Sequence, residues 1–242
     1  MNTQSIHLSE GISQRKAAIL AGSFSLVLAF AAGIAEFYAR QQLIVPDDAV
    51  ETAKRIIAGQ TSFRIGIAGF AVSLICDLLI AWALYVFLKP VNKSLSLLVA
   101  WSRLIYTAIF AISVLELVNG FQMLTEENLS AVLESGQLNE LALQRFRGFD
   151  NGWMIGFLFF GIHLLLLGYL AVKSGFVPKI IGFLVLTAGL AYFSSNIVKL
   201  VMPNYESYET VFTAVVAFPS VVGELSLAIW LLAKGGRNAG LA

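Results

Sequence analysis

The sequence predicts an all-α fold: a polytopic membrane protein with a bundle of six transmembrane helices and short amphipathic helices in its two long outer loops. The 242 residues are 58% hydrophobic and 13% charged, whereas soluble domains are about a quarter charged. Six apolar segments reach the roughly 20 residues that span a bilayer. A polar bundle interior is also expected, because each charge in hydrocarbon costs roughly 2.5–3.5 kcal/mol and five ionisable residues lie well inside these segments: Asp77, Arg103, Glu116, His163 and Glu224.

The six predicted spans are residues 17–37, 65–88, 94–123, 152–172, 178–200 and 211–233. They form a single domain over residues 17–233, between tails at residues 1–16 and 234–242. The third span is the longest, so we expect it to tilt or to continue past the bilayer as an exposed helix.

The first span also has features of a cleaved signal peptide. Arg15 and Lys16 resemble its basic region, and the run from Ala29 to Ala31 resembles a small-residue cleavage site. The apolar run is nevertheless long enough to span, and an uncleaved helix gives an even helix count. We therefore expect six spans, with cleavage as the alternative.

The loop charges predict the orientation in the membrane. The side with both tails and two short loops carries one acid, Glu10, against eight basic residues: Arg15, Lys16, Lys89, Lys93, Lys173, Lys179, Lys234 and Arg237. The other side mixes seven basic residues with ten acids. Basic residues in short loops favour the cytoplasm. The sequence thus predicts a multi-pass protein of the bacterial cytoplasmic membrane with both termini in the cytoplasm.

The two long outer loops each contain a segment with apolar residues at helical spacing, at residues 49–58 and 128–146. Both are predicted to form short amphipathic helices on the outer interface. They could act as a lid or partner surface, or simply cover the loop backbone.

Four ionisable residues are predicted to lie at one depth. Asp77, Arg103, His163 and Glu224 lie nine to eleven residues from the cytoplasmic ends of their helices, about 14–16 Å deep. We expect Arg103 to pair with Asp77, Glu224 or both, and His163 to donate to the free carboxylate. The cluster is either a site for a ligand or proton, or a set of buried pairs that fixes helix register.

Pro219 lies five residues before Glu224 and is predicted to kink the sixth helix and open space beside this carboxylate. A second polar layer is predicted nearer the outer side, with Glu116 and Lys199 as a pair that either binds a ligand or is structural. Its members are Glu36, Glu116, Asn119, Asn196 and Lys199.

Signals for catalysis or cofactors are weak. The chain has no HExxH, G-x-S-x-G, P-loop or CxxC motif, so no catalytic residue, cofactor or metal is predicted. The histidines are His7 and His163 alone, which excludes a bis-histidine haem inside the bundle. Arg103 would repel a metal on Asp77, His163 and Glu224. Cys76 reads as a small buried hydrophobe, and the net charge of +1 gives no reason to expect a nucleic-acid partner.

Several short motifs carry a family resemblance over nearly the whole chain. They are Phe63-Arg64, Cys76-Asp77, Leu88-Lys89-Pro90-Val91, Arg103, Lys173-Ser174-Gly175, Val177-Pro178-Lys179 and Gly189-Leu190-Ala191-Tyr192. With them the chain resembles a widespread bacterial six-helix membrane family catalogued as domain of unknown function 4386. The resemblance implies six spans in the inner membrane. It implies no activity.

Three functions remain open from the sequence. The first is a small transporter or ligand-binding, sensor-like protein that uses the Asp77–Arg103–His163–Glu224 cluster. The second is a structural or accessory protein that binds a protein partner. The third is an intramembrane enzyme acting on a lipid-like substrate, with the carboxylates and His163 as acid and base. Membrane lipids are expected partners in every case.

Overall fold

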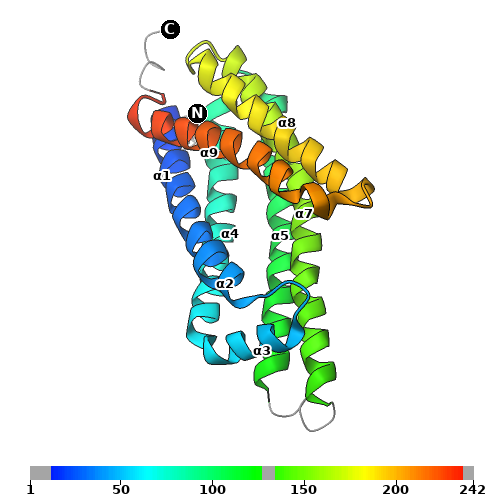
Figure 1. Ribbon diagram of the computed structural model, residues 1–242. Coiled ribbons are helices and arrows are strands. Elements are labelled where there is room, and N and C mark those ends of the chain that lie inside the picture. Colours follow the sequence, from blue (N-terminus) through cyan, green and yellow to red (C-terminus); the bar gives the residue numbers. More distant parts are fainter. Residues whose placement is uncertain (1–11, 127–133, 237–242) are drawn as a thin grey trace, which may run out of the picture.

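The computed structural model describes residues 12–126 and 134–236, and all regular structure in these ranges is helical (Figure 1). The predicted tails therefore lie partly outside the described residues, at 1–11 and 237–242. The elements are α1 (Gln14–Gly33), the π-helix η1 (Ile34–Arg40), α2 (Gln41–Leu43), α3 (Ala49–Ala58), α4 (Gln60–Leu88), α5 (Lys93–Thr125), α7 (Ser135–Lys173), α8 (Lys179–Val201), the 3-10 turn η2 (Tyr205–Tyr208) and α9 (Glu209–Ala233).

Six helical segments of the described chain are long and apolar enough to cross a membrane, as the sequence predicts. They are Gln14–Leu43, Gln60–Leu88, Lys93–Thr125, Ser135–Lys173, Lys179–Val201 and Thr210–Ala233. Their outward faces carry large exposed apolar side chains, such as Phe30, Ile75, Ile112 and Phe218. Such faces suit lipid rather than water, so the protein is a multi-pass membrane protein.

The six long helices form a closed ring. Each packs against its neighbours in chain order, α1 on α4, α4 on α5, α5 on α7, α7 on α8 and α8 on α9, and α9 returns to α1 (Figure 1). Because every long helix contributes one face to the inside of this ring, polar residues on six different helices can meet there.

The helix ends on the predicted cytoplasmic side agree closely with the sequence prediction. Five of the six lie within one residue of the predicted bound, and α1 begins at Gln14 rather than residue 17. Ser13 caps α1 by accepting from the Lys16 N–H, and Asn92 caps α5 by accepting from the Leu95 N–H. After α7, Gly175 adopts φ +73°, which a glycine tolerates without strain.

The helix ends on the opposite side extend further than predicted. The largest difference is in α7, which begins at Ser135 instead of residue 152 and is 39 residues, or about 58 Å, long. The prediction of a separate amphipathic helix over 128–146 is therefore wrong for its described part, which forms the start of α7. Residues 128–133 lie outside the described residues. Leu138, Leu143 and Phe146 are buried, because this part of α7 packs on α5 and α3 rather than on lipid.

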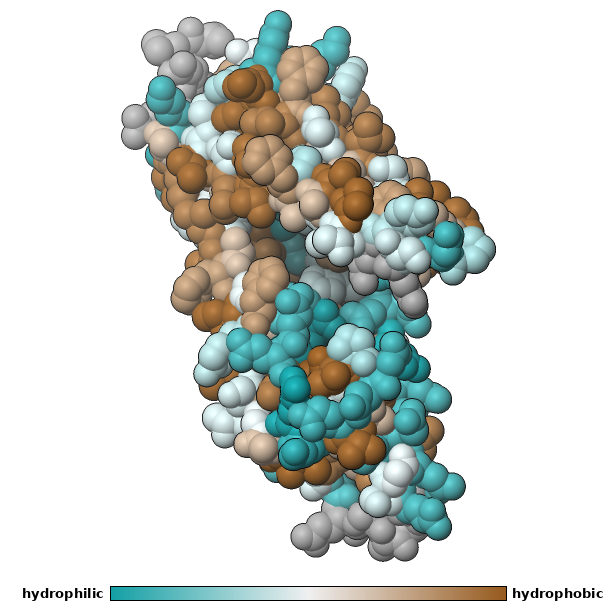
Figure 2. Space-filling view, in the orientation of Figure 1, coloured by the Kyte–Doolittle hydropathy of each residue, from teal (hydrophilic) through white to brown (hydrophobic). Residues whose placement is uncertain are grey.

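The amphipathic helix predicted over residues 49–58 is confirmed as α3. Asp48 caps it by accepting from the Glu51 N–H, and its apolar side packs on α7 and α5. Figure 2 shows the consequence for the surface: the end that carries α3 is largely hydrophilic, whereas the other half is largely apolar. The molecule thus has an apolar membrane part and a hydrophilic end, which lies on the predicted outer side.

Aromatic rings fill the core of the outer half. Phe63 of α4 stacks on Phe121 of α5 and meets the edge of Phe146 of α7, with ring centroids 5.5 and 5.7 Å apart. A second group of aromatic residues in mutual contact lies further inward: Phe70, Phe110, Phe149, Trp153, Tyr106, Phe157 and Phe160. We call the two groups together, from Phe63 to Phe160, the aromatic column.

Glycines set the packing of α7 against α8. A Cβ atom added at Gly168 would lie 2.7 Å from the Leu186 nitrogen and 2.8 Å from the Gly182 oxygen. Gly161 and Gly189 are equally close to the opposite helix. These small residues let two membrane helices approach closely.

Candidate functional site

Three of the four predicted cluster residues meet in the structure. The Arg103 guanidinium of α5 donates from Nε to Asp77 Oδ1 of α4 at 2.8 Å, and its Nη2 lies 2.6 Å from the same oxygen. Its Nη1 lies 3.1 Å from Nε2 of His163 on α7. These contacts join three helices of the ring through a single guanidinium.

The hydrogen-bond partners fix the state of His163. Arginine can only donate, so Nε2 of His163 must accept and cannot carry a proton. The other ring nitrogen, Nδ1, lies 2.9 Å from the Val99 carbonyl oxygen and therefore donates to it. His163 is thus neutral and protonated on Nδ1. The prediction that His163 donates to the free carboxylate is wrong, because its N–H donates to the Val99 carbonyl oxygen and its other ring nitrogen accepts from Arg103.

The three side chains are deeply buried, with exposed fractions of 1% for Asp77, 5% for Arg103 and 0% for His163. Phe160 of the aromatic column completes the environment, because the guanidinium carbon lies 5.4 Å from its ring centroid. Each buried charge therefore has a countercharge or hydrogen-bond partner, which such burial requires.

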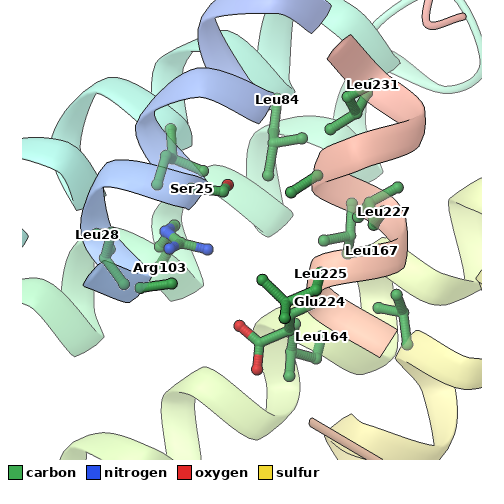
Figure 3. A pocket seen from close by; sticks show the side chains of 14 residues that line it. Ser25, Leu28, Leu84, Arg103, Leu164, Leu167, Glu224, Leu225, Leu227 and Leu231 are labelled. Atoms are coloured by element: carbon green, nitrogen blue, oxygen red, sulfur yellow. The ribbon is translucent and has the colours of Figure 1, made fainter. Parts of the chain in front are cut away.

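The fourth predicted residue, Glu224 of α9, lies across a cavity from Arg103. Figure 3 shows both side chains projecting into the space between the helices, with Ser25 of α1 nearby. None of the hydrogen bonds or ion pairs found among the described residues involves the Glu224 carboxylate. The predicted Arg103–Glu224 pair is thus absent as a direct contact, and α9 continues as one helix through Pro219.

The cavity occupies the centre of the ring. Its unfilled space is about 560 Å³, counted with the part that opens outward, and about 70 Å³ of this is available to the centres of water-sized molecules. That is room for several waters, since one water needs roughly 10–15 Å³. All six long helices contribute lining residues: Ser25, Leu28, Ala29, Ile80, Leu84, Arg103, Leu164, Leu167, Val185, Glu224, Leu225, Leu227, Ala228 and Leu231.

The predicted second polar layer is not one layer in the structure. Glu116 pairs with Arg145 at 3.3 Å and not with Lys199, whose ammonium lies 5.5 Å from the Tyr205 ring centroid. Asn119 is exposed, and Asn196 donates to the Tyr192 carbonyl of its own helix. The prediction placed Glu116 by helix depth alone and did not anticipate that α7 extends far enough to bring Arg145 beside it.

Glu36, also predicted for that layer, belongs to a cluster that the sequence analysis missed. Arg40 donates to both Glu36 oxygens at 2.7 and 2.6 Å and lies 2.9 Å from Asp150 Oδ1 of α7. The four-residue spacing of Glu36 and Arg40 was a usable signal for their pairing. Ser25 was also missed, although it is one of three polar residues in the first span, with Ser23 and Glu36.

The described residues contain no group of three His, Cys, Asp or Glu side chains placed to hold a metal ion. Cys76 is buried and free, beside Asp77 on α4. The chemistry that the site offers is therefore a carboxylate and a paired guanidinium facing an otherwise apolar cavity.

Comparison with known proteins finds a relative and a family but supplies no activity. The chain is 29% identical over 171 residues to an uncharacterized protein of Archaeoglobus fulgidus, covering 71% of this chain and 84% of the relative. No solved structure matches the chain significantly. The model of one family matches residues 20–235, which include most of α1, the five other long helices and every residue that lines the cavity. The chain belongs to this family, described as Domain of unknown function (DUF4386).

Proposed function

We propose that this protein is a small transporter or sensor-like receptor of the bacterial cytoplasmic membrane that binds a small solute in the cavity at the centre of its helix ring. Both termini lie in the cytoplasm in this proposal, because the basic short loops and tails are on that side. The chemistry of this cavity determines which class of solute can bind.

The observation that carries the proposal is a cavity with room for several waters that has Arg103 on one wall and Glu224 on another. Membrane bundles without a ligand gain stability by filling such space with side chains, because dispersion contacts replace the hydrophobic effect there. An ionisable residue that faces unfilled space inside a membrane is expensive, and it is a functional-site hypothesis by default.

A structural or accessory function is the second candidate, and a different observation favours it. Asp77, Arg103 and His163 form a complete network, and no buried side-chain polar atom of the described residues lacks a partner. A network of this kind can simply fix the register of α4, α5 and α7. It does not account for Glu224 or for the cavity.

A solute screen tests the proposal. Wild-type protein in lipid nanodiscs is melted in the presence of a panel of small cations, anions, amines and neutral solutes. At least one of them is expected to raise the melting temperature, by the linkage between binding and stability.

Two variants identify the cavity as the site of that effect. Ser25→Phe places a ring in the cavity, and Glu224→Gln removes its free carboxylate, so both should reduce the shift. Val27→Phe on the outward face of α1 is the matched control, since Val27 is 47% exposed and does not line the cavity. A panel without any effect on wild type, or a shift that survives Ser25→Phe, would favour the accessory function.

A further inference from the structure

The charges at the cavity are unequal. The positive charge of Arg103 is matched by Asp77 at 2.6 Å, and His163 is neutral by its hydrogen bonds. Glu224 adds a carboxylate that no described cation contacts. An ionised carboxylate in such a place needs a positive charge from a source other than these side chains.

The rest of the lining is apolar. Apart from Ser25, Arg103 and Glu224, the lining consists of Leu, Ile, Val and Ala side chains, and Ser25 uses its hydroxyl to donate to Ala21 of its own helix at 2.8 Å. A lining of hydrocarbon with few polar groups, of which the Glu224 carboxylate is the one charge without a contacting countercharge, is typical of sites for ligands that are largely apolar.

The cavity opens between α1 and α9. Nine of its fourteen lining residues are buried, and the five that keep exposure all lie on these two helices: Ser25, Leu28, Ala29, Glu224 and Leu225. Figure 2 shows a hollow on this face of the molecule. The hollow lies where the apolar half meets the hydrophilic end. Large apolar side chains of the same two helices, such as Phe30 and Val221, are exposed, and from this we infer that the opening faces the hydrocarbon layer.

The ends of the ring do not offer an equivalent route. Toward the outer side, the aromatic column fills the space among α4, α5 and α7, and the gap beside Phe63 and Phe70 has no room for a water molecule. Toward the predicted cytoplasmic side, Arg15 of α1 donates to the carbonyl oxygens of Leu231 and Leu232 on α9 at 3.0 and 2.7 Å.

The packing of α1 on α9 explains where the two helices separate. Their close approach is at the cytoplasmic end, where a Cβ added at Gly22 would lie 2.7 Å from the Ala228 oxygen and one at Gly235 would lie 2.7 Å from Ala18. Beyond Gly22 the two helices diverge (Figure 1), and the five exposed lining residues begin at Ser25. The opening is therefore a property of the helix crossing.

From these observations we propose that the cavity accepts a monocationic amphiphile that enters sideways from the membrane between α1 and α9. Its cationic group would lie against Glu224 and its alkyl part among the leucines. This inference rests on the proposed function and adds to it the ligand class and the route. A cation on an apolar chain matches both the free carboxylate and the hydrocarbon-facing opening, whereas an anion would meet Glu224 as a like charge.

Three probes with one eight-carbon chain test the ligand class: octyltrimethylammonium, octanol and octanoate. Binding to protein in nanodiscs is measured by calorimetry, with empty nanodiscs subtracted to remove partition into lipid. Wild type is expected to bind the ammonium probe and to bind octanol and octanoate at least about tenfold more weakly. Glu224→Gln should weaken binding of the ammonium probe by about tenfold or more, and Glu116→Gln, which alters a carboxylate paired outside the cavity, should not.

The route is tested at the opening. Ala29→Trp places a large ring in the opening and should reduce binding of the ammonium probe, whereas Val27→Trp on the outward face of α1 should leave it unchanged. Both variants change lipid-accessible positions, so their melting temperatures report whether the fold is kept.

The outcomes separate this inference from the proposed function. Preference for octanol or octanoate, or ammonium binding unchanged in Glu224→Gln, would overturn the cationic ligand and leave a solute site in place. Ammonium binding unchanged in Ala29→Trp would overturn the sideways route. If none of the three probes binds wild type, the cationic-amphiphile inference fails. The solute screen then decides alone whether the cavity binds anything.

Discussion

Arg40 and Arg103 each lie near two carboxylates and a phenylalanine ring, but the space around them is filled differently. At the outer end, Arg40 contacts both of its carboxylates, Glu36 and Asp150, and lies 5.2 Å from the ring centroid of Phe149. In the membrane part, Arg103 contacts Asp77 and lies 5.4 Å from the ring centroid of Phe160. Its second carboxylate, Glu224, lies across a cavity and is not contacted.

The two surroundings differ in how completely side chains fill the space around the arginine. Around Arg40 the core is filled with aromatic rings, and the adjoining gap has no room for water. Around Arg103 the helices leave a cavity, and the Glu224 carboxylate of α9 lies beside this unfilled space. Structural necessity accounts for the first cluster and for Asp77–Arg103–His163, but not for Glu224.

The largest expected effect comes from removing each arginine. Arg103→Gln leaves Asp77 buried without a countercharge, which should lower the free energy of unfolding by about 3–5 kcal/mol. Arg40→Gln should cost less, about 1 kcal/mol, because Asp150 can still reach water. The side chains of Asp77 and Asp150 are 2% and 43% exposed, respectively.

Unfolding of both variants in mixed micelles measures the contrast, with wild type in the same detergent. Equal losses in the free energy of unfolding would contradict this prediction, since they would mean that burial does not distinguish the two arginines.

A smaller effect is expected at His163. His163→Leu removes the acceptor for Arg103 Nη1 and the donor to the Val99 carbonyl, so it should cost about 1–3 kcal/mol. Nitrogen NMR of labelled histidine at neutral pH should find a neutral ring with its proton on Nδ1. A proton on Nε2 would contradict the hydrogen-bond assignment and reopen a role for His163 as a donor to the site.

The sequence was sufficient for much of the membrane part. The abrupt changes from apolar to basic residues at Leu88 and Lys173 locate the helix ends on the predicted cytoplasmic side to within one residue. The number of residues from those ends predicted one depth for Asp77, Arg103 and His163, and in the structure Arg103 contacts the other two. The count works because an α-helix has a fixed rise per residue.

The outer end could not be predicted in the same way. The extension of α7 from Ser135 is amphipathic, and periodicity alone does not tell whether its apolar side meets lipid headgroups or another helix. The partner of Glu116 depends on that choice, which is why Arg145 was missed. The distance between Arg103 and Glu224 depends on how far α9 separates from α1, and no residue pattern gives a crossing geometry directly.

We propose that Asp77 is structural and that Glu224 belongs to a binding site, although both carboxylates lie near Arg103. Thermal unfolding of Asp77→Asn and Glu224→Gln against wild type, in one nanodisc preparation without ligand, tests this most directly. Asp77→Asn should lose about 3–5 kcal/mol, because it strands Arg103, and Glu224→Gln should be neutral or slightly stabilising. A loss in Glu224→Gln as large as that in Asp77→Asn would contradict the account and make Glu224 part of the structural network.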